Sequence, residues 1–171
     1  MNKILTLCAA AAAVFLSAAC TKEGPSRFKG DYTFKTSGTV TVKPAGDDLS
    51  DPVVYSLQDE NGQMDVVARD RSSGDMVVAM NILGGSVLTF DAVADGMRMT
   101  ITPFTRQITI PVVEEGVFET AFPVATVTVT GYAERYADAL LFWIEYTGSY
   151  TYRGVDYEIA ESDISCWATE N

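Results

Sequence analysis

Apolar and polar residues alternate along most of the chain, beginning at Phe28. In the stretch GDYTFKTSGTVTVK, residues 30–43, one face carries the apolar side chains Tyr32, Phe34, Val40 and Val42. The opposite face carries lysine, serine and threonine. A period of two residues predicts a β-strand with one buried and one solvated face, whereas a helix would repeat every 3.6 residues.

Turn-forming residues interrupt this alternation at short intervals. Asn61-Gly62 is the strongest such signal, because the pair supplies the two positive-φ positions of a type I′ hairpin. Further interruptions fall at Gly84-Gly85, Asp95-Gly96, Pro103 and Gly154. The pattern predicts short strands that follow one another through hairpin-sized connections.

Residues 28–171 are therefore predicted to form one all-β domain with about eight strands. Clean alternation and short connections favour a single antiparallel up-and-down β-barrel. A β-sandwich is the alternative, although it usually needs longer crossovers. The looser stretch Pro111–Phe122 is expected to hold one turn of helix at most.

Residues 1–19 do not follow the alternating pattern. Lys3 precedes an uncharged stretch rich in leucine and alanine, which is the layout of a secretory signal peptide. The small residues 17–19 directly before Cys20 resemble the lipobox of bacterial lipoproteins, with Leu16 one position further from the cysteine than is usual. The resemblance implies cleavage before Cys20 and attachment of acyl chains such as palmitate to it. Ordinary cleavage after Ala19 with a free cysteine is the alternative.

The residues after Cys20 predict where the anchored protein resides. Residues 20–27 are interpreted as a lipidated tether. Lys22-Glu23 resembles the short signal that directs Bacteroidetes-type lipoproteins to the outer face of the outer membrane. The expected location is therefore the outer membrane, facing the cell exterior, with its periplasmic face as the alternative.

Composition excludes some functions. The chain has 12 Lys+Arg against 23 Asp+Glu, giving a formal charge of −11. Such a surface repels the phosphates of nucleic acids, so no nucleic-acid partner is expected. Because the chain has no histidine, it lacks the commonest general base and metal ligand. We therefore expect no enzyme, no cofactor and no metal site. The acid pair Asp59-Glu60 is interpreted as solvated turn residues.

Two stretches carry a resemblance to the calycin superfamily, which includes lipocalins. Gly30-Asp31-Tyr32 opens the first strand much as Gly-x-Trp does in lipocalins, with Tyr32 in place of tryptophan. The late stretch TVTVTGYAERYADALLFWIEYTG, residues 126–148, is similar to the penultimate hairpin of calycin-like barrel lipoproteins. No C-terminal arginine can be assigned to cover Tyr32. The resemblance implies a calycin-like barrel and does not specify a ligand.

Candidate ligand-binding residues come from the aromatic and methionine side chains of the strands. Glu145 lies in the apolar stretch LLFWIEYTG, where a carboxylate among aromatics has the surroundings to bind or donate. The alternative is a glutamate at the strand's exit that reaches water or pairs with an arginine. Aromatic rings and flexible thioethers suit an amphipathic pocket, and they also fill ordinary cores. The candidates are Tyr32, Phe34, Met97, Met99, Phe142, Trp143, Glu145 and Tyr146.

The sequence thus predicts a lipid-anchored, non-catalytic barrel of the cell envelope that binds a small apolar or amphipathic ligand. The alternative is a solid barrel whose loops contact a protein or glycan in an outer-membrane complex, which includes a role as an inhibitor. A continuous cavity favours the first prediction, and a solid interior favours the second.

Overall fold

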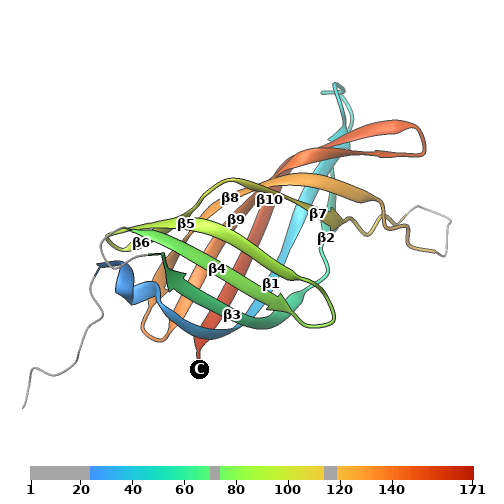
Figure 1. Cartoon of the computed structure of the whole chain (residues 1–171). Helices are drawn as coiled ribbons and strands as arrows, with labels where there is room; N and C mark the ends of the chain where they lie inside the picture. Colours follow the sequence, from blue (N-terminus) through green and yellow to red (C-terminus); the bar gives the residue numbers. More distant parts are fainter. Residues whose placement is uncertain (1–23, 70–73, 114–118) are drawn as a thin grey trace, which may run out of the picture.

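The computed structural model describes residues 24–69, 74–113 and 119–171, which form one antiparallel sheet closed into a barrel (Figure 1). A 3₁₀ turn, η1, precedes the strands. The elements are η1 Gly24–Phe28, β1 Gly30–Pro44, β2 Val53–Ser56, β3 Glu60–Ala68, β4 Asp75–Ile82, β5 Val87–Asp95, β6 Arg98–Ile101, β7 Phe104–Thr109, β8 Val124–Tyr136, β9 Ala139–Tyr152 and β10 Val155–Glu170.

The ten strands occupy eight positions around the barrel. The order β10-β9-β8-β6-β5-β4-β3-β1 is closed by the antiparallel pairing of β1 with β10. β2 and β3 share one position, since both pair with β1, and β6 and β7 share another beside β8. Neighbouring positions follow the chain, which confirms the up-and-down barrel and is compatible with a calycin-like fold. The sandwich alternative is not realised.

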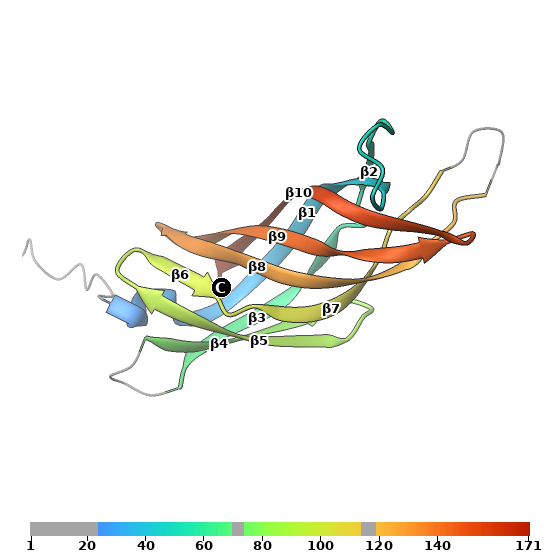
Figure 2. The ribbon, with the colours of Figure 1, turned by 90° about the horizontal axis from the view of Figure 1, so that it is seen from above.

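Alternation places the predicted apolar face of β1 inside the barrel. Tyr32, Phe34, Val40 and Val42 are all at most 2% exposed, whereas Lys35 points to solvent. The same alternation in β3, β4 and β6 buries four methionines: Met64, Met76, Met80 and Met99. These side chains pack with Phe28 of η1 into a solid core at one end of the barrel, here called the closed end. The β9–β10 hairpin projects from the opposite end (Figures 1 and 2).

A tyrosine, an arginine and a glutamate tie the closed end together. The Arg135 guanidinium donates to the Tyr32 hydroxyl at 2.8 Å and to the Glu170 carboxylate. Its Nη1 also donates to the Arg27 carbonyl at 2.9 Å. We call Tyr32, Arg135 and Glu170 the closed-end cluster. Arg135 lies in β8, so Tyr32 does have an arginine partner, although it is not a C-terminal one.

The predicted hairpin at Asn61-Gly62 is wrong, because both residues lie inside β3. They pair with Lys35 and Phe34 of β1, and the preceding strand β2 continues along β1 instead of turning back onto β3. A Cβ on Gly62 would lie 2.0 Å from the Asn81 carbonyl oxygen. The glycine therefore serves a close backbone approach between strands. The turns predicted at Gly84, Gly96 and Gly154 are present, with φ of 74°, 57° and 79°.

The predicted signal peptide (residues 1–19), Cys20 and Lys22-Glu23 lie outside the described residues. Of the predicted tether, residues 24–27 belong to η1, which packs on the closed end. The described part of Pro111–Phe122 holds a single β-bridge, between Val112 and Ala121, and no helix. Across residues 24–69, 74–113 and 119–171, no helix has the length and apolar character needed to cross a membrane.

Candidate functional site: a cavity at the open end of the barrel

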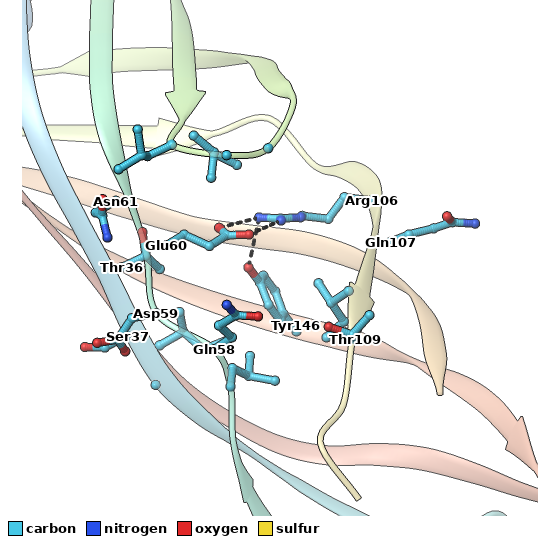
Figure 3. Close-up of a pocket in the computed structure, with 18 of the residues that line it drawn as sticks. Thr36, Ser37, Gln58, Asp59, Glu60, Asn61, Arg106, Gln107, Thr109 and Tyr146 are labelled. Carbon is cyan, nitrogen blue, oxygen red and sulfur yellow. Dashed lines mark hydrogen bonds and ion pairs between the residues drawn. The ribbon is translucent and has the colours of Figure 1, made fainter. Parts of the chain in front are cut away.

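A cavity of about 500 Å³ opens in the half of the barrel away from η1. Its walls come from the β2–β3 connection, the β4–β5 turn and β7, with β1 and β9 behind them (Figure 3). The cavity exists because residues 57–59, between β2 and β3, are not in a strand, and because β4 ends at Ile82. The strands β7 to β10 on the other side of the barrel extend beyond this level. A volume of this size suits a small organic ligand.

An ion pair between Glu60 and Arg106 spans the base of the cavity. Arg106 Nη2 donates to Glu60 Oε1 at 2.6 Å, and Nη1 donates to Oε2 at 3.1 Å, so the pair is bidentate. The Glu60 side chain is 26% exposed and the Arg106 side chain is 16% exposed. Both residues occupy inward positions of their strands, Glu60 at the start of β3 and Arg106 in the middle of β7. The two strands are not neighbours, so the pair crosses the barrel interior.

Tyr146 adds a hydroxyl group to the polar base of the cavity. Arg106 Nη1 also donates to the Tyr146 hydroxyl, at 3.5 Å. Burial works against the charge of Arg106, but Glu60 and Tyr146 outweigh it and raise its pKa. Burial raises the pKa of Tyr146, so this hydroxyl stays neutral and can donate a hydrogen bond. Figure 3 shows the tyrosine ring pointing at the ion pair.

Thr36 carries a buried hydroxyl that is poorly satisfied. The residue is 7% exposed, and among the described residues its Oγ1 has no partner in ordinary hydrogen-bond geometry. It faces Cys166 across the β1–β10 pairing, and a thiol is a weak partner. Burial raises the pKa of Cys166 to about 12, an effect that contact with Thr36 only partly offsets. We call Thr36, Glu60, Arg106 and Tyr146 the cavity cluster.

The barrel is filled on the inner side of the cavity cluster. The space there measures about 20 Å³, enough for roughly one water molecule, and its walls include Met80, Phe90 and Phe142. Phe90 stacks on Phe104 with ring centroids 5.0 Å apart. The cavity cluster therefore separates an open, mixed polar and apolar cavity from a closed apolar core.

The structure places the eight predicted ligand-binding residues in three environments. Tyr146 alone among them lines the main cavity, and Phe142 lines the small space beneath it. Tyr32, Phe34 and Met99 are buried in the closed-end core, where they contact other side chains.

The remaining three candidates lie outside the barrel interior. Met97 sits in the turn between β5 and β6 and is 65% exposed. Trp143 and Glu145 alternate with the inward residues of β9, so they point outward, and Glu145 is exposed. The outward face of LLFWIEYTG, which carries Trp143 and Glu145, therefore does not line the barrel interior.

Sequence reasoning missed Glu60, Arg106 and Thr36. The sequence pattern predicts Glu60 in a solvated turn, whereas it lies on the inward face of a strand. A signal was available, since Phe104, Arg106 and Ile108 alternate with polar residues and place a charge on an apolar face. An inward charge of this kind requires a partner, and Glu60 in the pattern Glu60-x-Gly62-x-Met64 is its counterpart.

Among the described ranges, no three Cys, Asp or Glu side chains come together in a way that could hold a metal ion. The cavity cluster can donate hydrogen bonds to a bound molecule and accept hydrogen bonds from it. Comparison with family models, curated proteins and solved structures gave no match to this chain. The functional proposal therefore rests on the geometry and charges of the cavity.

Proposed function

We propose that this protein is a lipid-anchored barrel of the bacterial outer membrane that binds a small amphipathic molecule in its cavity without transforming it. The observation that carries the proposal is the combination of a cavity of about 500 Å³ with a buried polar cluster at its base. Sites for small ligands are typically concave, with a few convergent polar groups among apolar ones. Here the apolar lining includes Leu57, Ile82 and Ile108.

The fold supports an anchored arrangement with an accessible cavity. Cys20 precedes Gly24, the first described residue, by four positions, which span at most ~14 Å. A lipid on Cys20 would therefore hold the closed end of the barrel near the membrane. The β4–β5 turn, which borders the cavity, lies at the end away from η1 (Figure 1), so the cavity would face away from the lipid.

The anchor is tested by feeding cells an alkyne analogue of palmitate and detecting label on the protein. Label is expected on the full chain and not on a Cys20→Ala variant. External protease then tests the location, since a surface-facing protein is degraded on intact cells and a periplasm-facing one is protected. Absence of label on the full chain, with the protein released into the medium or periplasm, contradicts the anchor.

Ligand binding is tested by native mass spectrometry of the mature protein, purified from cells that express the full chain and exposed to lipid and glycan extracts. An adduct is expected with the natural chain and should be lost in Leu57→Trp, which fills the cavity from its wall. Val54→Trp, at a 62% exposed position of β2, is the matched control and should keep the adduct. No adduct across broad extracts contradicts a ligand-binding role.

A second candidate function is contact with a glycan or protein through the outer wall. On β8 and β9 Tyr132 stacks on Trp143 with ring centroids 4.9 Å apart, and Tyr136 meets the same indole edge-on at 6.4 Å. Arg98 lies 3.9 Å above the Tyr132 ring. Outward aromatic rings with polar tips suit the faces of sugars. Glycan binding that is lost in Trp143→Ala and retained in Leu57→Trp would favour this candidate.

A further inference from the structure

We infer that the cavity selects a ligand with an uncharged, hydrogen-bonding head group and holds that head group inward, against the cavity cluster, with the apolar part toward the rim. This inference rests on the proposed ligand-binding function and adds the chemical class and the orientation of the ligand. The predicted class is an amphipathic molecule with a hydroxyl-rich or amide head, such as an alkyl glycoside.

The charges around the cavity are already matched to one another. Arg106 is engaged by both carboxylate oxygens of Glu60, at 2.6 and 3.1 Å. Asp59, the other charged residue in the lining, pairs with Lys35 at 2.8 Å. An anionic ligand must either lie beside the Glu60 carboxylate, which repels it, or displace that carboxylate from Arg106 and leave it uncompensated in a partly buried site. A cationic ligand meets the same two obstacles at the Arg106 guanidinium.

An uncharged head group can bind without breaking the ion pair. Arg106 has five N–H groups, and its contacts with Glu60 and Tyr146 engage three of them. The Tyr146 hydroxyl accepts from Arg106 and retains its own proton for donation. Thr36 lines the same cavity; its hydroxyl is shielded from solvent and, among the described residues, has only the Cys166 thiol beside it. A hydroxyl or amide of the ligand that reaches it would supply the stronger hydrogen bond that the thiol does not.

The shape of the interior sets the direction of the ligand. On the inner side of the cavity cluster the space is about 20 Å³, which excludes an alkyl chain. On the outer side the lining includes Leu83 and Val124, which are 79% and 53% exposed. Large apolar side chains that face water at a cavity's edge gain from being covered. The apolar part of the ligand is therefore placed on these rim residues and its head on the cavity cluster.

The inference is tested with three probes that share an eight-carbon chain and differ in head group. Octyl glucoside is uncharged, octanoate is an anion and octyltrimethylammonium is a cation. Each is titrated, below its critical micelle concentration, into the mature natural protein and followed by isothermal calorimetry. Octyl glucoside is expected to bind at least tenfold more tightly than either charged probe.

A charge variant provides the sharper test. Glu60→Gln leaves Arg106 without its carboxylate, so octanoate binding is expected to strengthen at least tenfold over the natural protein. Asp59→Asn removes an equal charge from the lining without touching Arg106, and it should leave the order of the three probes unchanged. If Glu60→Gln fails to fold, as judged by circular dichroism, Thr36→Val replaces it and should weaken octyl glucoside at least threefold without affecting octanoate.

The outcomes separate this inference from the function it rests on. Binding of octanoate by the natural protein as tightly as octyl glucoside overturns the uncharged class and leaves ligand binding intact. Unchanged octanoate affinity in folded Glu60→Gln, or unchanged octyl glucoside affinity in Thr36→Val, overturns the role of the cavity cluster. Binding of none of the probes, together with no adduct from extracts, rejects the proposed function itself.

Discussion

The two ends of this barrel use the same three residue types for different purposes. The closed-end cluster and the cavity cluster each join a tyrosine hydroxyl, an arginine and a glutamate, and their ion pairs are equally sheltered from solvent. The arginines are 15% and 16% exposed, and both glutamates are 26% exposed. What separates the clusters is how completely each polar group is satisfied.

At the closed end the hydrogen bonds of the arginine are all short. Arg135 donates to Tyr32 at 2.8 Å and to two backbone carbonyls at 2.9 Å, and Tyr32 in turn donates to the Phe28 carbonyl at 2.8 Å. In the cavity the corresponding distance from Arg106 to the Tyr146 hydroxyl is 3.5 Å, and the Thr36 hydroxyl has no good partner within the described part of the chain. A cluster whose polar groups all have hydrogen-bond partners stabilises the fold. A cluster beside open space with incompletely satisfied polar groups is available to a ligand.

The largest difference between the two ends should appear in packing. Phe34→Ala removes a 2% exposed ring from the closed-end core and should lower the free energy of unfolding by ~3–5 kcal/mol. Leu57→Ala acts on a half-buried cavity wall, where water can fill the gap, and should cost less than about 1 kcal/mol. Urea unfolding monitored by tryptophan fluorescence measures both. Equal losses would contradict a solid closed end beside an open one.

The two arginines provide the next comparison. Arg135→Met leaves a carboxylate, a hydroxyl and two carbonyls without their donor and should cost about 2–4 kcal/mol of stability, with ligand binding retained. Arg106→Met should cost about 1–2 kcal/mol, since Glu60 can turn toward the water of the cavity, and should abolish ligand binding. Urea denaturation measures the stability of both variants, and calorimetry measures their ligand binding. Loss of binding in a folded Arg135→Met protein would argue against it.

How much of this contrast the sequence predicted depends on the range of each interaction. Alternation identified the buried face of β1, including Tyr32 and Phe34, because strand periodicity is a local property. Local reasoning failed at Asn61-Gly62, where the missing side chain of Gly62 accommodates the Asn81 carbonyl of another strand. That error also assigned Glu60 to a turn and so concealed the cavity.

Partners far apart in sequence were beyond a local pattern. Arg135 reaches Tyr32 across 103 positions, and Arg106 reaches Glu60 across 46. Their strands are not sequence neighbours, so only the closure of the barrel brings them together. Alternation does reveal that a charge faces inward, but the identity of its partner depends on the register of the whole sheet.

Alkaline pH should weaken the closed end. Burial raises the pKa of Tyr32 from 10.0 to about 12, so the folded state holds this proton more tightly than the unfolded chain does. The resulting stability is fully present below pH 10 and is lost as the pH rises toward 12, by about 2–3 kcal/mol. Tyr32→Phe should remove that part of the slope in urea unfolding measured at pH 9, 10 and 11. An unchanged slope would show that Tyr32 ionises alike in both states.

The smallest expected effect on stability concerns the Thr36 hydroxyl, and it is a gain rather than a loss. Thr36→Val replaces a poorly satisfied buried hydroxyl with a methyl group and should raise the free energy of unfolding by about 1 kcal/mol. Thr41→Val, on the outward side of the same strand, is the control and should change stability little. A Thr36→Val protein that is less stable than the natural one would mean that this hydroxyl is well satisfied in the absence of ligand.

The most direct test of the contrast between the two ends is a ¹⁵N–¹H NMR titration of the mature protein with octyl glucoside below its critical micelle concentration. Saturable shifts are expected at the backbone amides of Thr36, Glu60, Arg106 and Tyr146, with Tyr32, Arg135 and Glu170 unmoved. Shifts confined to the outer wall around Trp143, or spread equally over both ends, would contradict the assignment of the cavity as the binding site.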